Sequence, residues 1–148
     1  MWLLDTNVVS ELRRAGSGRA DPGVVAWAEQ ADPAALFLSV VSLHELELGV
    51  RLKEHRDPRR GQLLRQWLDQ QVVPSFAGRI LPVDEAVARC SAALHVPDPR
   101  PLRDGLIAAT ALVHSMTVVT RNVSDFVPTG VAVFNPWSEA ARSMAGTN

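Results

Sequence analysis

The chain has a single cysteine and a single lysine, and these shortages limit the chemistry it can perform. Cys90 alone forms neither an internal disulfide nor a cluster of thiolate ligands, so any metal must bind through oxygen or imidazole groups. The sequence also lacks an apolar run of the roughly 20 residues that span a bilayer, and its start carries no basic segment followed by an apolar stretch. We therefore expect a cytoplasmic protein without a membrane contact.

An excess of positive charge is also missing. The chain has 15 Lys and Arg against 16 Asp and Glu, which gives a formal net charge of −1 at pH 7. Most nucleic-acid-binding modules carry a clear excess of Lys and Arg, so any contact with nucleic acid should be local. All basic residues except Lys53 are arginines, which suit bidentate contacts with phosphate or carboxylate, although a high-GC coding bias explains this equally well.

The length and composition indicate one ordinary globular domain. Of the 148 residues, 47% are hydrophobic and 21% are charged. A chain of this length buries roughly 70% of its unfolded surface, which is enough for a hydrophobic core. We expect a single domain over residues 1–138 and a C-terminal tail over residues 139–148, whose small polar residues predict flexibility.

Short apolar runs alternate with helical patterns along the chain. The predicted strands lie at residues 1–4, 36–41, 80–83, 117–120 and 131–134. The predicted helices lie between them and begin at Thr6 or Asn7, Asp21, Ser42, Asp84 and Leu102, with a further helical pattern after a break at Asp57-Pro58. This alternation predicts an α/β fold with three α/β/α layers and a mainly parallel central sheet.

Four acids lie near the ends of predicted strands. Asp5 follows the first strand, and Glu45 lies one turn into the helix after the second. Asp125 lies in the polar turn after the strand at residues 117–120, and Asp104 begins the helix that leads into that strand. Right-handed crossovers place the carboxyl ends of parallel strands at one edge of the sheet, so we expect these acids to converge on one crevice.

Clustered carboxylates repel one another, and a hard divalent cation relieves this repulsion. Oxygen ligands and retained waters favour Mg²⁺, with Mn²⁺ as the alternative. One or two such ions can activate water and stabilise charge on a phosphodiester. The acids therefore predict the chemistry of a metal-dependent nuclease.

Each of these acids also has a purely structural explanation. Asp5 is equally well explained as the cap of the first helix, and Glu45 fits a capping box with Ser42. Asp125 and Asn122 are both suitable turn residues. Taken singly, these residues carry little functional information.

Asp104 favours a functional role more strongly than the other acids. Its spacing places it on the same helix face as Ile107, Ala108 and Ala111, and that face should pack inward. A buried acid needs a partner for its charge. We therefore expect Asp104 to meet a cation.

Several short motifs follow one another in a specific order over nearly the whole chain. They are Leu4-Asp5-Thr6-Asn7, Glu45-Leu46 within residues 42–49, residues 104–111, and Thr120-Arg121-Asn122 followed by Asp125-Phe126. In order and spacing the sequence resembles the PIN-domain ribonuclease toxins of the VapC and FitB type. Residues 77–82 and 131–137 resemble the FitB branch in particular.

The resemblance implies the toxin component of a type II toxin–antitoxin system, acting as a Mg²⁺-dependent endoribonuclease. It implies that Asp5, Glu45 and Asp104 are the catalytic and metal-binding acids, with Thr6 and Thr120 as polar neighbours. We add Asp125 as the candidate fourth acid, and Asn7 and Asn122 as supporting residues. In many relatives the fourth acid stands where this chain has Asn122. Either Asp125 replaces it or the site uses three carboxylates.

The resemblance also implies the partners of the chain. It predicts a homodimer, an RNA substrate, and a cognate antitoxin resembling VapB or FitA, through which DNA is contacted only indirectly. An apolar groove would receive the antitoxin segment that obstructs the acidic crevice. Candidate residues for the groove are Val9, Leu12 and Trp27, and candidates for RNA phosphate contacts are Arg13, Arg14 and Arg19, although core packing and a solvated surface explain the same residues.

Two other functions fit parts of the pattern. A catalytically weak PIN domain that only binds a partner would explain Asn122 at the position of the fourth acid. A metal-dependent phosphotransfer domain would also place an aspartate such as Asp5 at a strand end. Phosphotransfer sites generally need a lysine near the phosphoryl group, and Lys53 lies far from any predicted strand end.

Overall fold

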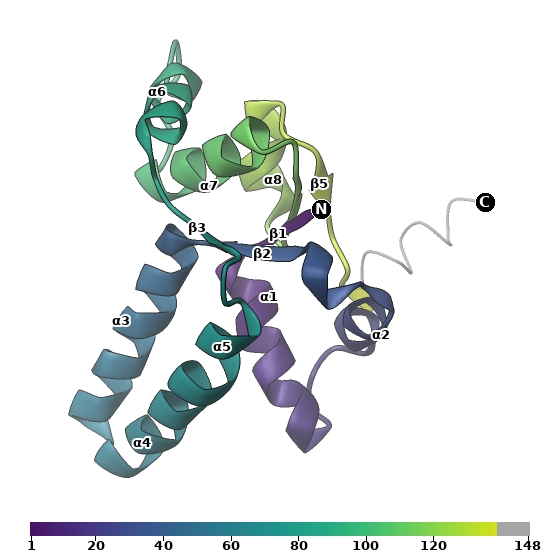
Figure 1. Ribbon diagram of the computed structural model, residues 1–148, viewed down its shortest axis with the longest axis vertical. Helices are drawn as coiled ribbons and strands as arrows, with labels where there is room; N and C mark the ends of the chain where they lie inside the picture. Colours follow the sequence, from purple (N-terminus) through teal and green to yellow (C-terminus); the bar gives the residue numbers. More distant parts are fainter. Residues whose placement is uncertain (139–148) are drawn as a thin grey trace.

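The central sheet has five parallel strands in the order β3-β2-β1-β4-β5. The computed structural model describes residues 1–138, and the tail predicted at residues 139–148 lies outside the described residues (Figure 1). The strands are β1 (Trp2–Leu4), β2 (Leu36–Ser39), β3 (Ile80–Leu81), β4 (Thr117–Val119) and β5 (Val133–Phe134). The predicted α/β fold with a parallel sheet is confirmed.

The central strand β1 has buried side chains on both faces of the sheet. Leu3 and Leu4 point to opposite faces, as successive strand residues do, and both are almost completely buried. Leu4 packs in a core cluster that includes Leu38, whereas Leu3 packs in a second cluster that includes Ile107. Because both faces are covered, the strands appear in the sequence as continuous apolar runs.

Helices cover the two faces of the sheet (Figure 1). On one side lie α1 (Thr6–Arg13), α2 (Pro22–Gln30), α3 (Val40–Arg56), α4 (Pro58–Trp67), a π-helical segment (Leu68–Val72) and α5 (Val73–Ser75). On the other side lie α6 (Glu85–Leu94), α7 (Leu102–Val113) and α8 (Val123–Phe126). The 3-10 turns are Arg14–Ser17, Pro33–Ala35 and Val127–Thr129. None of the helices within residues 1–138 has the length and apolar character needed to cross a membrane.

The boundary between β2 and α3 differs from the prediction. The strand ends at Ser39, and the helix begins at Val40 rather than at Ser42. The Ser39 hydroxyl accepts a hydrogen bond from the Val41 N–H at 3.0 Å and so caps the helix. Ser42 is fully buried within the first turn, so the predicted capping box between Ser42 and Glu45 is wrong.

The segment after β4 is helical rather than an open polar turn. Residues Val123–Phe126 form α8, and Asp125 lies within it. Phe126 is fully buried in the cluster beneath α7, and burial of its ring holds this short segment in a helical turn. Asp125 therefore directly precedes a residue, Phe126, whose position is fixed by burial.

An ion-pair network joins α3 to α4. Arg65 on α4 donates hydrogen bonds to both carboxylate oxygens of Glu47, at 2.9 and 2.7 Å, and to Glu54 at 3.0 Å. The hydrogen bonds from Arg65 lower the pKa of Glu47 to about 2 from an ordinary value of 4.5. Glu47 is therefore ionised in the folded chain over the whole neutral and mildly acidic range.

Replacing Glu47 by glutamine should reduce stability in a pH-dependent way. The folded-state pKa lies below the ordinary one, so the contribution of the carboxylate is complete above pH 4.5 and is lost as the pH falls to about 2. Because the pair is partly exposed and water screens it, we expect a loss of about 1 kcal/mol near neutral pH. Urea unfolding at several pH values measures this loss. Glu85→Gln, which alters an exposed pair with Arg89, is the control. An equal loss of unfolding free energy in Glu47→Gln at neutral pH and at about pH 2 would contradict the prediction.

Candidate functional site

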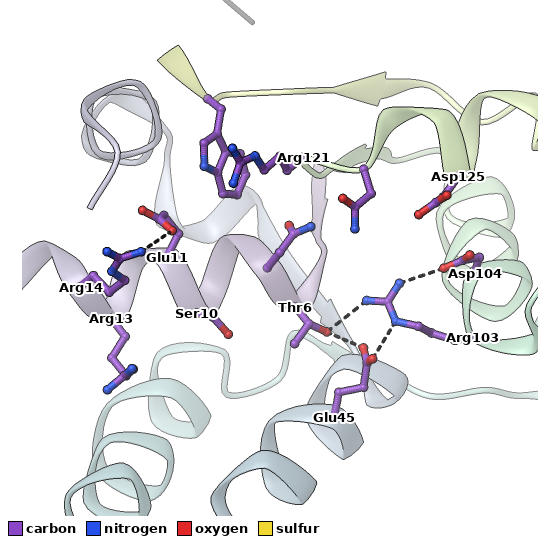
Figure 2. A pocket seen from close by; sticks show the side chains of 13 residues that line it. Thr6, Ser10, Glu11, Arg13, Arg14, Glu45, Arg103, Asp104, Arg121 and Asp125 are labelled. Carbon is purple, nitrogen blue, oxygen red and sulfur yellow. Dashed lines mark hydrogen bonds and ion pairs between the residues drawn. The ribbon is translucent and has the colours of Figure 1, made fainter. Parts of the chain in front are cut away.

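The carboxyl edge of the sheet borders a cavity of about 690 Å³ (Figure 2). Six of the eight predicted site residues line it: Thr6, Asn7, Glu45, Asp104, Asn122 and Asp125. The other two, Asp5 and Thr120, are fully buried, and the Thr120 hydroxyl donates a hydrogen bond to Asp5 Oδ2 at 2.7 Å. The structure therefore brings the predicted residues to one place.

Asp5 caps the first helix, and its carboxylate lies among the clustered acids. Its backbone N–H extends the β1–β4 pairing by donating to the Val119 carbonyl at 2.9 Å. Its Oδ1 accepts a hydrogen bond from the Thr6 N–H at 2.7 Å, so Asp5, rather than Thr6 or Asn7, is the N-cap of α1. Its carboxylate also belongs to the acidic cluster, and a helix N-terminus favours a negative charge at this point.

Glu45 reaches the same cluster from the second turn of α3. Its Oε1 accepts a hydrogen bond from the Thr6 hydroxyl at 2.6 Å, and its Oε2 accepts one from Arg103 Nε at 2.7 Å. Burial raises the pKa of Glu45, but these hydrogen bonds outweigh it, so the pKa lies below its ordinary value. Glu45 is therefore held as a carboxylate.

Asp104 lies in the first turn of α7 and faces inward, as predicted. It is 7% exposed, and Ile107, Ala108 and Ala111 on the same face are fully buried. Its Oδ1 accepts a hydrogen bond from Arg103 Nη1 at 2.9 Å. The expected cation partner is thus a neighbouring side chain of the same chain.

Arg103 is the residue at this site that the sequence did not reveal. Its guanidinium contacts Glu45, Asp104 and Asp5, and Figure 2 shows its side chain between Glu45 and Asp104. Burial lowers the pKa of Arg103, but the three carboxylates outweigh it and raise the pKa above its ordinary value. One local signal was present: a cation in the first turn of a helix opposes the helix dipole and needs a compensating partner.

The fourth corner of the site is built around Thr120. The Thr120 hydroxyl oxygen accepts from the Asn122 backbone N–H at 3.0 Å and from the Asn7 side-chain amide at 3.4 Å. The side chains of Asn122 and Asp125 both line the cavity. Asn122 is linked to the acidic cluster because Thr120, which accepts its backbone N–H, donates to Asp5. Asp125 reaches the cavity from α8.

The donor set suits a hard divalent cation. Carboxylate oxygens come from separate elements, and Asn7 Oδ1 is a buried acceptor without a hydrogen-bond partner among residues 1–138. Mg²⁺ typically uses one or two carboxylates and keeps several waters, which polar neighbours can hold. Within that same range, however, no three Asp, Glu, His or Cys side chains stand close enough to hold one ion. The Arg103 guanidinium lies between the acids instead.

Arginines line the other part of the cavity. Arg13 lies over the Trp67 ring at 5.8 Å, Arg121 lies over the Trp137 ring at 5.6 Å, and Arg14 pairs with Glu11 at 3.6 Å. Figure 2 shows Arg13 and Arg14 away from the Glu45–Arg103–Asp104 group. The predicted Arg19 is not part of the lining. The cavity thus joins an acidic region to a region that can bind phosphate.

A second, more apolar hollow of about 280 Å³ lies between α1 and the α4–α5 region. Its lining includes Val9 and Leu12, two of the three predicted groove residues. The third, Trp27, lies elsewhere and packs against Trp2, with ring centroids 5.7 Å apart. Trp27 therefore has the packing role that was the alternative explanation for it.

Comparison with known proteins gives consistent matches over most of the chain. A model of the PIN domain matches residues 2–126. The toxin FitB of Neisseria gonorrhoeae is 42% identical over 145 residues, which cover 94% of this chain and 100% of that protein. A VapC ribonuclease of Sinorhizobium fredii is 37% identical over 145 residues, covering 95% of this chain and 100% of the relative.

Solved structures agree with the sequence matches. The crystal structure of FitAcB from Neisseria gonorrhoeae has a TM-score of 0.84 at 42% identity and covers 93% of this chain and 99% of that one. The structure of FitAB bound to a DNA fragment has a TM-score of 0.83 at 41% identity, with 93% and 96% coverage. At this identity and coverage the likeness extends beyond a shared fold.

Proposed function

This chain belongs to the PIN-domain family, and we propose that it is the toxin of a type II toxin–antitoxin pair that acts as a ribonuclease. The observation that carries the proposal is the convergence of Asp5, Glu45 and Asp104 on one guanidinium, that of Arg103, beside the cavity at the carboxyl edge of the sheet. The relatives that match over nearly their full length are a toxin and a VapC ribonuclease.

The acidic cluster is the metal site of this nuclease. Asp5, Glu45 and Asp104 would hold Mg²⁺ or, in its place, Mn²⁺, and Asp125 would supply a fourth carboxylate. The bound ion supplies charge stabilisation at the scissile phosphate and activation of water. Asp5 and Glu45 would be oriented for this by the hydroxyl groups that already donate to them.

The arginine region of the cavity binds the RNA backbone. Guanidinium groups form paired hydrogen bonds with phosphate, and Arg13 and Arg121 are each positioned by an aromatic ring. A strand held there would place a neighbouring phosphate at the acids. This local positive region provides for RNA binding in a chain whose net charge is −1.

The apolar hollow beside α1 is the docking site for the antitoxin. The side chains of Val9, Leu12 and Phe76 line this hollow and give it the apolar character that suits an amphipathic segment. The solved FitAB structure is bound to a DNA fragment, and in this proposal the antitoxin partner carries the DNA contact. The chain itself forms a homodimer in this proposal.

Removal of the divalent ion tests the activity. The purified chain should cleave RNA in Mg²⁺ or Mn²⁺, should lose cleavage in excess EDTA, and should regain it when excess Mg²⁺ is restored, because the acids cannot stabilise the phosphate without the ion. Gel analysis of an end-labelled RNA measures this. Cleavage that continues in EDTA, or no cleavage with either ion, would overturn the proposal.

A further inference from the structure

The Arg103 guanidinium donates a hydrogen bond to one carboxylate oxygen of each of three acids. Its Nε donates to Glu45 Oε2 at 2.7 Å, its Nη1 donates to Asp104 Oδ1 at 2.9 Å, and its Nη2 donates to Asp5 Oδ1. A surface ion pair usually joins two groups, whereas here each nitrogen of one guanidinium faces a different carboxylate. Arg103 is therefore the positive centre of the whole cluster.

The second oxygens of Asp5 and Glu45 also have donors. Asp5 Oδ2 accepts from the Thr120 hydroxyl at 2.7 Å, and Glu45 Oε1 accepts from the Thr6 hydroxyl at 2.6 Å. A cation that approaches both acids must share their oxygens with these donors. The hydroxyl groups are neutral and can remain, but the guanidinium carries a charge that repels a second cation at the same point.

Arg103 can leave the cluster without unfolding its surroundings. Its side chain is 30% exposed and lines the cavity, whereas Asp5 behind it is fully buried. The residue lies in the first turn of α7, where the helix dipole disfavours a positive charge. Among residues 1–138, the guanidinium is held by the three carboxylates and by a longer hydrogen bond to the Thr6 hydroxyl at 3.5 Å.

We propose that Arg103 is a built-in counter-cation that occupies the metal position of the metal-free chain and is displaced when a divalent ion binds. This inference rests on the proposed function, because it takes the same acids as metal ligands. Arg103 neutralises the clustered carboxylates before the ion arrives and lowers the affinity for the ion by competing with it. The acids can close around the ion once the guanidinium has moved into the cavity.

Calorimetric titration with Mn²⁺ alone tests the competition directly. Arg103→Gln should bind Mn²⁺ about tenfold more tightly than the parent, since loss of one charge partner changes the affinity of a carboxylate for a cation on the scale of a pKa unit. Arg14→Gln removes the same charge from the lining of the same cavity without touching the three acids, and its affinity should match the parent. An unchanged or weaker affinity in Arg103→Gln would overturn the proposal.

Thermal unfolding provides a second readout. Without metal, Arg103→Gln should unfold at a lower temperature than the parent, because the carboxylates repel one another. Added Mn²⁺ should raise its unfolding temperature by more than it raises that of the parent. If the variant folds only with Mn²⁺, the proposal is supported; an equal rise in both proteins would contradict it.

Arg103→Lys keeps the charge but replaces the three-pronged guanidinium by a single ammonium group. Its Mn²⁺ affinity should lie closer to that of the parent than to that of Arg103→Gln, and an affinity equal to that of Arg103→Gln would count against the proposal. The inference and the proposed function fail in different ways. If Arg103→Gln cleaves RNA but binds Mn²⁺ no more tightly, only the inference fails; if the parent chain cleaves no RNA in either ion, the proposed function fails.

Discussion

Asp5→Asn should reduce the rate of metal-dependent RNA cleavage by roughly 10³-fold, because loss of one carboxylate removes several kcal/mol of metal-derived stabilisation from the transition state. Asparagine has almost the same shape as aspartate and is an equally good helix cap. The hydrogen bond from the Thr6 N–H can therefore persist, and the fold should remain. The substitution removes only the negative charge that the metal ion requires.

The measurement is the initial cleavage rate of an end-labelled RNA at a fixed Mg²⁺ concentration. Asp104→Asn should show a loss of the same order, since Asp104 offers the second buried carboxylate of the cluster. Asp32→Asn is the matched control, because Asp32 caps the turn Pro33–Ala35 outside the cavity lining. Cleavage by Asp5→Asn at the parental rate would remove Asp5 from the metal site.

Phe126→Ala should lower the free energy of unfolding by about 3–5 kcal/mol. The Phe126 ring is fully buried in the core cluster that includes Leu3 and Ile107, and its loss leaves a cavity that the surrounding side chains cannot fill. Domains of this kind have a total stability of about 5–15 kcal/mol, so a large fraction would be lost.

Urea unfolding at neutral pH measures this difference. Val127→Ala is the control, because Val127 is the next residue and is 57% exposed; its effect should stay within about 0.5 kcal/mol. A loss below about 1 kcal/mol in Phe126→Ala would show that α8 does not depend on the ring.

The sequence was sufficient to predict the layers of the fold and the location of the acids. Continuous apolar runs predicted a sheet buried on both faces, and the crossover rule then placed Asp5 and Glu45 at one edge. The inward orientation of Asp104 followed from helical spacing alone. These features depend on local periodicity and on topology, which a sequence carries directly.

Features set by contacts between distant segments were missed. Ser39 and Ser42 are equally good caps locally, and the pairing of Ser39 with Leu81 at the end of β2 helps to decide where the strand ends. The four-residue helix α8 is too short for a periodic pattern and depends on the burial of Phe126. Arg103 lies 98 residues from Asp5 in sequence, and no local pattern predicts their contact.

Anomalous X-ray diffraction from a crystal of the full chain soaked in Mn²⁺ tests the metal assignment most directly. We expect an ion at roughly 2 Å from carboxylate oxygens of Asp5 and Asp104, with Glu45 in direct or water-mediated contact. The guanidinium of Arg103 should then no longer contact the acids. The same electron density shows whether Asp125 or Asn122 is the fourth ligand of the ion. An Mn²⁺ peak away from Asp5 and Asp104, in a protein preparation that cleaves RNA, would contradict the assignment of these acids as the metal site.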